Sequence, residues 1–360
     1  MSTRIGCEYC NRVRAPGRLV SRSLGVGFLG AGLVTQAIHL PVLAGLADRF
    51  HVVSVMDVDV GVAERVAARC GATFTTDADA IMQDPSIDVV VVCSPDAMHA
   101  AQVVAACQAG KLAVLCEKPL AVGHAEAVQI SAAAATSGTN VMVGAMHVYD
   151  PAYRAAHRAW LEQNDEAVFT QSSIFLPVND FFTPQASEPA SPPPLPTSGE
   201  GRPDGVMLRG AVLGLAIHNL PLLRHFHPRL GDVASAHFIR PFGYAIVVGD
   251  EAQTLELLGY MGGTWPPNWA LRVVGRNCEL RVMFPPSFVL AGSSRAELAT
   301  ADWTRVFEFG TNGYQCEWEA LYAAAVGNAE PVVSLRDVID DITYALDLAD
   351  QVERLVGERT

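Results

Sequence analysis

An alternating series of apolar strands and alanine-rich helices occupies residues 24–145 and limits what this chain can fold into. Helical stretches such as Val60–Arg69 and Ala97–Ala109 separate the candidate strands, which are continuous apolar runs. Such runs indicate parallel strands that are covered on both faces. The alternation therefore predicts a doubly wound α/β domain. Its candidate strands are Leu24–Leu29, His51–Met56, Ile87–Cys93, Leu112–Cys116 and Asn140–Gly144.

The pattern changes after Tyr149, where strands follow one another without helices of crossover length. Gly, Pro and Asn residues punctuate them, which predicts a mostly antiparallel sheet in a second domain over residues 146–360. We expect a helix over Leu208–Phe226, another over Tyr314–Val326 and a C-terminal helix over 334–356, with Ser334 as its N-cap. The candidate strands are Ala167–Leu176, Val233–Ile239, Tyr244–Val248, Thr254–Tyr260, Ala270–Val274, Glu279–Phe284 and Arg305–Phe309.

Two segments are predicted to lie outside the folded core. Residues 1–23 are rich in arginine, and their composition predicts a disordered extension. Cys7 and Cys10 in this extension have no second Cys or His pair at zinc-binding spacing, so we expect no metal site. Residues 183–204 are rich in proline and predict a mobile loop, which is either a lid over the active site or an inert insertion.

Composition excludes two classes of partner. The formal net charge of -13 argues against nucleic acid, because phosphate binding needs a basic surface. No apolar run reaches the length of a membrane span. The cysteines are scattered and several fall in predicted core elements, which fits a reducing cytoplasm better than a disulfide framework. We therefore expect a cytoplasmic protein whose substrate is a small molecule.

A glycine-rich turn follows the first predicted strand and opens a helix. This strand–turn–helix order is typical of dinucleotide binding. The first glycine allows the tight turn, the second lets the backbone approach a pyrophosphate, and the first helical amides bind the anion. Thr35 stands where the pattern has its third glycine. The predicted phosphate-binding residues are Gly30, Ala31, Gly32, Leu33 and Val34.

Asp57 ends the second predicted strand, where a carboxylate accepts hydrogen bonds from the adenosine ribose and repels a 2′-phosphate. No Arg or Lys follows before Arg65. The sequence therefore favours NAD(H) over NADP(H). The structural alternative is that Asp57 caps the next helix, a role that Asp59 could fill instead.

Three further runs resemble the Gfo/Idh/MocA (glucose-fructose oxidoreductase / inositol dehydrogenase) family. They are Ser94-Pro95-Asp96-Ala97-Met98-His99, Ala109-Gly110-Lys111 and Cys116-Glu117-Lys118-Pro119-Leu120. The resemblance extends over nearly the whole chain after residue 24. It implies a Rossmann domain joined to an open antiparallel sheet, with the substrate between that sheet and the nicotinamide.

The resemblance also implies roles for the residues of these runs. Lys118 points at the reacting carbon, and its bond to Pro119 is compatible with a cis geometry. Family substrates are mostly sugars, cyclitols and their amino, deoxy or nucleotide-linked derivatives. On this basis we expect the cofactor to contact Cys93, Ser94, Pro95, His99, Glu117 and Lys118.

The family's second signature, Asp-x-x-x-His, is incomplete in this chain. His218 matches the acid/base histidine, but Gly214 stands at the aspartate position. Tyr149 is a candidate proton donor and His147 a candidate substitute for the lost carboxylate, and Asn179 is a further substrate-binding candidate. The structural alternatives are a surface role for Lys118, a core role for His218 and hinge packing for His147 and Tyr149.

These residues predict hydride transfer between a secondary alcohol or ketone and NAD(H), with His218 as general acid/base and Lys118 stabilising the developing alkoxide. One alternative is an epimerase, lyase or glycosidase that oxidises its substrate only transiently. Another is a catalytically silent ligand-binding protein. We also expect a homodimer or homotetramer, formed through an apolar face of the open sheet that includes Leu255, Leu257, Trp265 and Trp269.

Overall fold

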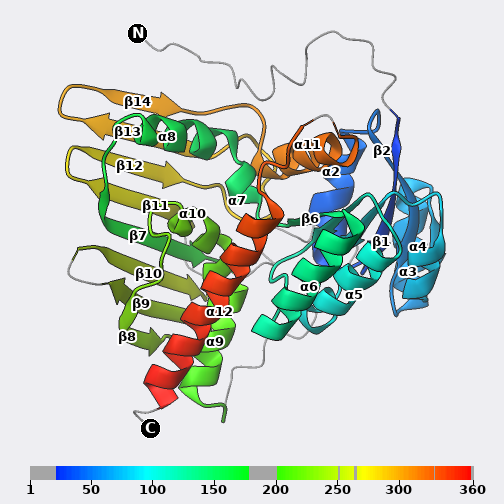
Figure 1. Cartoon of the computed structure of the whole chain (residues 1–360), viewed down its shortest axis with the longest axis horizontal. Coiled ribbons are helices and arrows are strands. Elements are labelled where there is room, and N and C mark those ends of the chain that lie inside the picture. Colours follow the sequence, from blue (N-terminus) through cyan, green and yellow to red (C-terminus); the bar gives the residue numbers. More distant parts are fainter. Residues whose placement is uncertain (1–21, 178–200, 250–251, 263–265, 328, 358–360) are drawn as a thin grey trace.

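The computed structural model describes residues 22–177, 201–249, 252–262, 266–327 and 329–357. Two sheets lie next to each other, each with helices packed against it (Figure 1). The long C-terminal helix α12 (Leu335–Gly357) runs along their junction. It packs against β6 and α6 of the first sheet layer and against α9 and β8 of the second.

The first sheet is parallel and has the strand order β3-β2-β1-β4-β5-β6. This is the order of a Rossmann fold, which confirms the doubly wound prediction. Strands β1, β4 and β5 are completely buried, as their continuous apolar runs indicate. Its strands are β1 (Leu24–Leu29), β2 (Phe50–Met56), β3 (Thr73–Thr75), β4 (Val89–Val92), β5 (Ala113–Cys116) and β6 (Asn140–Val143).

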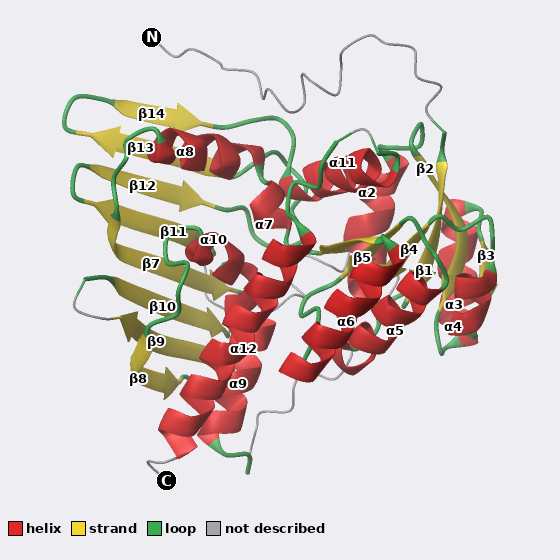
Figure 2. Cartoon of the chain, in the orientation of Figure 1, coloured by secondary structure: helices red, strands yellow, loops and turns green. Residues whose placement is uncertain are grey.

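Helices cover both faces of the first sheet (Figure 2). The first helical segment begins with a π-helical turn, η1, and continues as α2. The helices of this layer are η1 (Thr35–His39), α2 (Leu40–Ala44), α3 (Val60–Cys70), α4 (Ala78–Gln83), α5 (Asp96–Gln108) and α6 (His124–Ser137), and α11 (Gly313–Ala325) from the C-terminal part packs against α2.

The second sheet has the strand order β14-β13-β12-β11-β7-β10-β9-β8. Every neighbouring pair is antiparallel except β7 and β10, which run parallel. The predicted mostly antiparallel sheet is therefore confirmed. Its strands are β7 (Ala167–Leu176), β8 (Asp232–Phe238), β9 (Gly243–Gly249), β10 (Thr254–Met261), β11 (Asn268–Gly275), β12 (Cys278–Met283), β13 (Arg295–Thr300) and β14 (Thr304–Phe307).

Helices α8 (Pro151–Leu161), α9 (Asp204–Gly214), α10 (Leu220–Arg224) and α12 lie on one face of this sheet (Figure 1). Leu255, Leu257 and Trp269 are buried within the chain. The prediction that these residues form an intersubunit face is therefore wrong, and Trp265 lies outside the described residues.

The helix predicted over Leu208–Phe226 is broken into three pieces. Helix α9 ends at Gly214, a 3-10 turn η3 (Ala216–His218) follows, and α10 begins at Leu220. The predicted cap of α12 is present, because Ser334 Oγ accepts a hydrogen bond from the Asp337 amide at 3.1 Å. Within the described residues no helix is both long and apolar enough to cross a membrane.

Candidate active site

The glycine turn after β1 has the geometry that close backbone packing requires. Gly30 has φ +98, in the left-handed region that favours glycine, and a Cβ there would lie 2.5 Å from the Cys93 carbonyl oxygen. A Cβ on Gly32 would meet no atom within 4 Å. The space beside Gly32, at the N-terminus of the helical segment, therefore fits the pyrophosphate of a dinucleotide.

Thr35 has a structural reason to replace the third glycine. Its hydroxyl donates a hydrogen bond to the Gly30 carbonyl oxygen at 2.7 Å, and its side chain is buried. The threonine thus ties the first helical turn to the glycine turn. The sequence pattern alone shows only that a glycine is replaced at this position.

Asp57 is coupled to the same turn. Its Oδ2 accepts a hydrogen bond from the Ala31 amide at 2.8 Å, and its Oδ1 accepts one from the Asp59 amide at 3.0 Å. Asp59 caps α3 by accepting hydrogen bonds from the amides of Gly61 and Val62. Asp57 is therefore not the cap of that helix, and its carboxylate lies at the carboxyl end of β2 beside the glycine turn.

The loops after β4 and β5 are clamped together by His99. The imidazole is buried, and its Nδ1 and Nε2 lie 2.7 Å from the Pro119 carbonyl oxygen and 2.8 Å from the Ser94 carbonyl oxygen. Ser94 Oγ donates to Gln102 Oε1 at 2.6 Å, and Pro95 lies at the N-terminus of α5. The His99 side chain therefore holds these two loops together, and its contact with the cofactor stays a prediction.

Glu117 anchors the turn that carries Lys118. Its Oε2 accepts a hydrogen bond from the Lys118 amide at 3.3 Å, and its Oε1 lies 3.2 Å from His39 Nε2. A Cβ on Gly144 would lie 2.8 Å from Glu117 Oε1, so the carboxylate is tightly enclosed. Glu117 is thus positioned to hold the lysine turn more than to bind the cofactor.

His39 completes this buried network. Burial lowers the pKa of His39, and this opposes the effect of the neighbouring Cys93 and Glu117 side chains, which raise it. Trp318 Nε1, however, donates to His39 Nδ1 at 3.1 Å, and an indole N–H can only donate. The hydrogen-bond geometry therefore favours the neutral tautomer, in which Nε2–H donates to Glu117.

Lys118 reaches from the first sheet layer to the helices of the second. Its bond to Pro119 is cis, and its Nζ donates a hydrogen bond to the Gly214 carbonyl oxygen at 3.3 Å. The His218 amide donates to the Leu215 carbonyl oxygen at 3.3 Å, in 3-10 fashion. The Gly214 carbonyl is thus left at the C-terminus of α9, where a cation is favoured.

Lys118 and His218 border the same cavity, and Tyr149 lines it too. Burial lowers the pKa of His218 well below its usual value, and the charge of Lys118 lowers it further. The His218 ring lies edge-on to Trp269, with ring centroids 5.2 Å apart. The structure thus brings together all three residues that were predicted to be catalytic.

His147 belongs to a polar cluster around Asn219. Its Nδ1 is 3.3 Å from Asn219 Oδ1, which also accepts a hydrogen bond from Trp269 Nε1 at 2.9 Å. Burial lowers the pKa of His147 to about 3, so the ring is neutral at pH 7. Its hydrogen bond goes to Asn219 and not to His218. The predicted direct partnership with His218 is therefore wrong.

The sequence analysis did not identify several residues of the site. Asn219 follows His218 directly, but a single Asn carries no motif. Trp269 was considered only as part of an apolar face. Asn179 lies outside the described residues, as does the Cys7/Cys10 pair. In the described ranges no group of three or more His, Cys, Asp or Glu side chains could hold a metal ion.

Comparison with known proteins identifies the first sheet layer. A model described as "Oxidoreductase family, NAD-binding Rossmann fold" (GFO_IDH_MocA) matches residues 24–145. Inositol 2-dehydrogenase 1 of Saccharopolyspora erythraea is 40% identical over 137 residues, which are 37% of this chain and 40% of that protein. Inositol 2-dehydrogenase of Acidothermus cellulolyticus is 40% identical over 134 residues, 37% of this chain and 39% of that protein. The match thus spans about two fifths of the length of these relatives.

Solved structures share the fold over nearly the whole chain. KijD10, a 3-ketoreductase from Actinomadura kijaniata in complex with NADP and TDP-benzene, matches with a TM-score of 0.70 and 18% identity, over 91% of this chain and 96% of that one. Biliverdin reductase from Synechocystis, in complex with biliverdin and NADP+, matches with a TM-score of 0.69 and 18% identity. The match covers 91% of this chain and 98% of that one. The matched model thus assigns residues 24–145 to the NAD-binding Rossmann domain of the Gfo/Idh/MocA oxidoreductase family, and the solved structures share their fold with nearly the whole chain.

Proposed function

We propose that this protein is an NAD(P)-dependent oxidoreductase that interconverts a secondary alcohol and a ketone. The observation that carries the proposal is that Lys118 and His218 border one cavity, at the edge of the Rossmann sheet where β5 and β6 end. The glycine turn lies at the same edge, with open space beside Gly32. A dinucleotide bound there would present its nicotinamide near these two side chains.

Lys118 and His218 would have different roles in the reaction. The bound nicotinamide would accept or supply the hydride. Lys118 would donate a hydrogen bond to the substrate oxygen and stabilise the negative charge that develops on it. Because burial lowers its pKa, the His218 imidazole is neutral at pH 7 and would accept the hydroxyl proton during oxidation. Lys118 also keeps His218 neutral, since a second positive charge next to it is unfavourable.

For the substrate we propose a sugar, a cyclitol or a related biosynthetic derivative. The support is the resemblance of the Rossmann domain to the two inositol 2-dehydrogenases. For the cofactor we propose that NAD(H) is preferred over NADP(H), because the Asp57 carboxylate lies at the end of β2 beside the glycine turn. A 2′-phosphate at that position would be repelled by this charge.

The activity is tested with purified protein, NAD(H) or NADP(H), and a panel of cyclitols, sugars and their ketones. Lys118→Ala and His218→Ala should each lower kcat by about 10²–10⁴-fold. His237→Ala changes an exposed histidine on β8 and serves as the control. Wild-type turnover in both site variants would contradict the assignment.

The cofactor preference is tested separately with Asp57→Ala. The variant should gain affinity for NADP(H) relative to NAD(H), because the repelling carboxylate is gone. Tighter binding of NADP(H) than of NAD(H) by the unchanged protein would contradict the proposed preference. The binding measurement needs no substrate, so it does not depend on the first test.

Gly214 favours a second candidate reaction. Without a carboxylate at this position the acid/base groups differ from the family pattern, and bound NAD could serve for a transient oxidation in an epimerase, lyase or glycosidase. Product formation without a net change in NADH absorbance would identify this reaction. A stoichiometric change in NADH would support the simple oxidoreductase.

A further inference from the structure

Lys118 lies in a segment between β5 and α6 that has no regular secondary structure. This lysine segment, residues 117–123, connects Cys116, the last residue of β5, to His124, the first residue of α6. The backbone that carries the lysine is therefore held by individual contacts that side chains make with it, and these contacts decide where the Lys118 ammonium lies.

Side chains of the first sheet layer hold the lysine segment from one side. The His99 Nδ1 atom lies 2.7 Å from the Pro119 carbonyl oxygen. The Val122 amide donates a hydrogen bond to Glu126 Oε2 on α6 at 2.8 Å. These contacts leave the Val122 carbonyl oxygen available to the second sheet layer.

Arg209 binds that carbonyl from the second sheet layer. From the middle of α9, Arg209 Nη2 donates a hydrogen bond to the Val122 carbonyl oxygen at 3.3 Å. In the opposite direction, Lys118 Nζ donates to the Gly214 carbonyl oxygen at the end of the same helix. The lysine segment and α9 thus exchange two hydrogen bonds, each from a side chain of one to the backbone of the other. Residues 209 and 214 are about 7.5 Å apart along the helix, so the two contacts fix both the place and the direction of the segment.

Carboxylates on α12 orient the Arg209 guanidinium. Arg209 Nη1 donates a hydrogen bond to Asp350 Oδ1 and lies 3.6 Å from Glu353 Oε2. Helices α9 and α12 pack along each other (Figure 1). The Arg209 side chain is only 24% exposed. A guanidinium can pair with two carboxylates and one carbonyl at once, because its five N–H groups point in fixed directions.

We propose that Arg209 is a positioning residue for Lys118. It holds the Val122 carbonyl against α9, and the lysine segment then keeps the Lys118 ammonium at the cavity that it shares with His218. Arg209 is not among the described residues that line this cavity, so it acts through the segment and not by contact with the substrate. The inference rests on the proposed function for the role of Lys118.

Amide hydrogen exchange, measured on peptides that cover residues 117–123, tests the contact without a substrate. Arg209→Met should speed exchange in this segment at least about 10-fold, because the segment is released from α9. Arg354→Met is the matched control, since Arg354 is exposed on α12 and its Nε donates to the Asp350 carbonyl oxygen of its own helix. The control should leave exchange in the segment unchanged. Unchanged exchange in Arg209→Met would overturn the proposal.

Steady-state kinetics shows whether the effect reaches the reaction. Arg209→Met should lower kcat about 10-fold or more with little change in KM, because a displaced lysine no longer meets the charge that develops in the transition state. A raised KM with an unchanged kcat would mean that Arg209 contacts the substrate itself, and the positioning role would be wrong.

A double variant tests whether Arg209 acts through Lys118. In the Lys118→Ala background, Arg209→Met should change kcat by less than about twofold, because the lysine that Arg209 positions is already absent. A residue that only stabilises the fold would cause the same loss in both backgrounds. Equal fold-losses would therefore overturn the proposal.

Substitutions on α12 keep the proposal testable if Arg209→Met does not fold. Asp347 and Asp350 are both about half exposed and lie 3.5 and 3.4 Å from His124 Nε2. The ion pairs of Arg209 within the described residues include Asp350 but not Asp347. Asp350→Asn should therefore lower kcat and speed exchange in the lysine segment, whereas Asp347→Asn should do neither. Equal effects of the two substitutions would contradict the role of Arg209.

The two kinds of measurement separate this inference from the proposed function. If none of the tested alcohols or ketones is turned over, the proposed function fails. Faster exchange in Arg209→Met would then still show that Arg209 positions the segment that carries Lys118. Faster exchange together with an unchanged kcat of an active enzyme would overturn the proposal.

Discussion

The Lys118 ammonium donates a hydrogen bond to the carbonyl oxygen of Gly214, with 3.3 Å between Nζ and O. This contact joins the loop after β5 to the C-terminus of α9 and so connects the two sheet layers at the active site. It depends on the break between α9 and η3, because a continuous α-helix would direct the Gly214 carbonyl to the His218 amide. The irregular helix therefore makes an acceptor available to the lysine.

The same contact predicts that Lys118 contributes little to stability. Lys118→Met keeps the length of the side chain but removes the charge, and should lower the free energy of unfolding by less than about 1.5 kcal/mol. Its turnover should fall as far as that of Lys118→Ala. Urea denaturation and steady-state kinetics on the same preparation check both expectations. A large loss of stability would mean that the lysine is chiefly structural.

Gly30→Ala should abolish the binding of NAD(H). The added Cβ would lie 2.5 Å from the Cys93 carbonyl oxygen, and φ +98 is unfavourable for alanine. The turn must shift, and its amides then lose their alignment with the pyrophosphate. Gly71→Ala is a suitable control, because Gly71 also has positive φ but its added Cβ meets nothing within 4 Å. Calorimetric titration with NADH should show binding to the control and none to Gly30→Ala.

From the lowered pKa of His147 we predict that the protein loses stability in acid. Its pKa is about 3 in the folded protein and near 6.5 in the unfolded chain, so the unfolded chain binds more protons between these values. The stabilisation is present above pH 6.5 and is lost as the pH falls toward 3. At pH 5 the loss is about 2 kcal/mol. Urea denaturation from pH 7.5 to 5 should show this dependence in the unchanged protein and less of it in His147→Gln, and parallel curves would contradict the role of His147.

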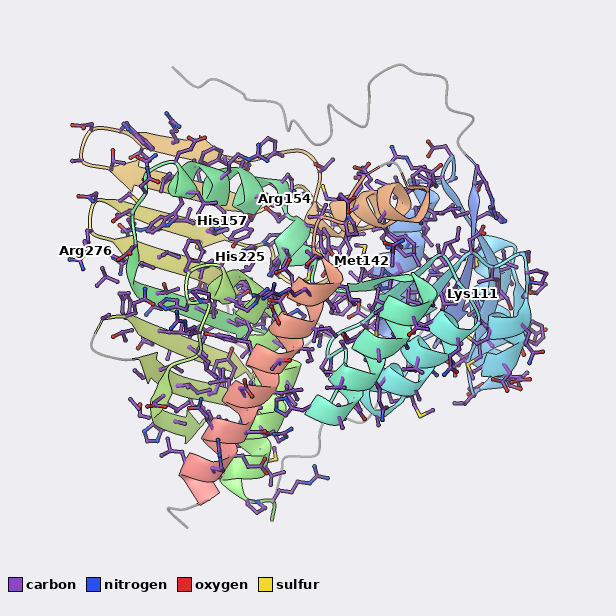
Figure 3. The ribbon with its side chains drawn as sticks, in the orientation of Figure 1. Lys111, Met142, Arg154, His157, His225 and Arg276 are labelled. Carbon is purple, nitrogen blue, oxygen red and sulfur yellow. The ribbon has the colours of Figure 1, made fainter. Side chains whose placement is uncertain are left out.

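We predict that a substitution at His157 stabilises the folded protein. It is stacked between Tyr153 and His225, with ring centroids 5.7 and 4.9 Å apart, and its Nε2 is buried without a hydrogen-bond partner in the described part of the chain. His157 and His225 lie beside the second sheet (Figure 3). His157→Phe preserves the stack and removes the unpaired atom, which should raise the free energy of unfolding by about 1 kcal/mol.

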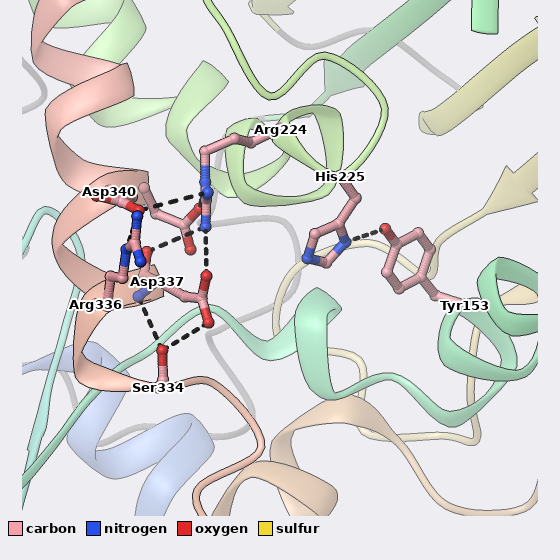
Figure 4. Close-up of polar contacts among 8 residues, drawn as sticks. Tyr153, Arg224, His225, Ser334, Arg336, Asp337 and Asp340 are labelled. Atoms are coloured by element: carbon pink, nitrogen blue, oxygen red, sulfur yellow. Dashed lines mark hydrogen bonds and ion pairs between the residues drawn. The ribbon is translucent and has the colours of Figure 1, made fainter. Parts of the chain in front are cut away.

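The control for this substitution is Tyr153→Phe. It removes the hydrogen bond between the Tyr153 hydroxyl and His225 Nδ1 at 2.7 Å, which is visible in Figure 4. This variant should lose about 1 kcal/mol. Chemical denaturation that showed the same direction of change in both variants would contradict the interpretation.

Asn219→Ala should be strongly destabilising. The Asn219 side chain is fully buried, accepts the Trp269 indole N–H and donates to Ser172 Oγ at 2.8 Å. Removing it leaves these two groups and His147 Nδ1 unpaired, at a cost of about 2–4 kcal/mol. Ser172→Ala removes only one of the contacts and should cost about 1 kcal/mol. Equal losses in thermal unfolding would show that Trp269 finds another acceptor.

The regular elements could be predicted because their patterns are local. β1 and β7 have the predicted bounds, since each is a continuous or alternating run with clear ends. β3 and α4 are too short to produce a periodic signal. The break at Leu215 also gives no signal, because its apolar neighbours fit a longer helix equally well. The position of the break is instead determined by the tertiary contacts around Lys118 and Asn219.

The active site could be predicted where a motif carries it and not where side chains meet by folding. Gly30 and Lys118 belong to motifs with a physical basis at fixed spacing. Asp341 is distant from His218 in the sequence and belongs to no motif, so only the fold brings the two residues to the same cavity. The contacts of His99 with two backbone carbonyls likewise depend on the fold and have no signal in the sequence.

The central place of β7 in the second sheet has a consequence for how the chain assembles. β7 pairs with β10 on one side and β11 on the other, and both strands are made long after it. Until residues 254–275 leave the ribosome, both edges of β7 remain without their final partners. Sheet formation is therefore a late, non-local event, and premature release or truncation before β11 should yield chains that aggregate through the open edges of this strand.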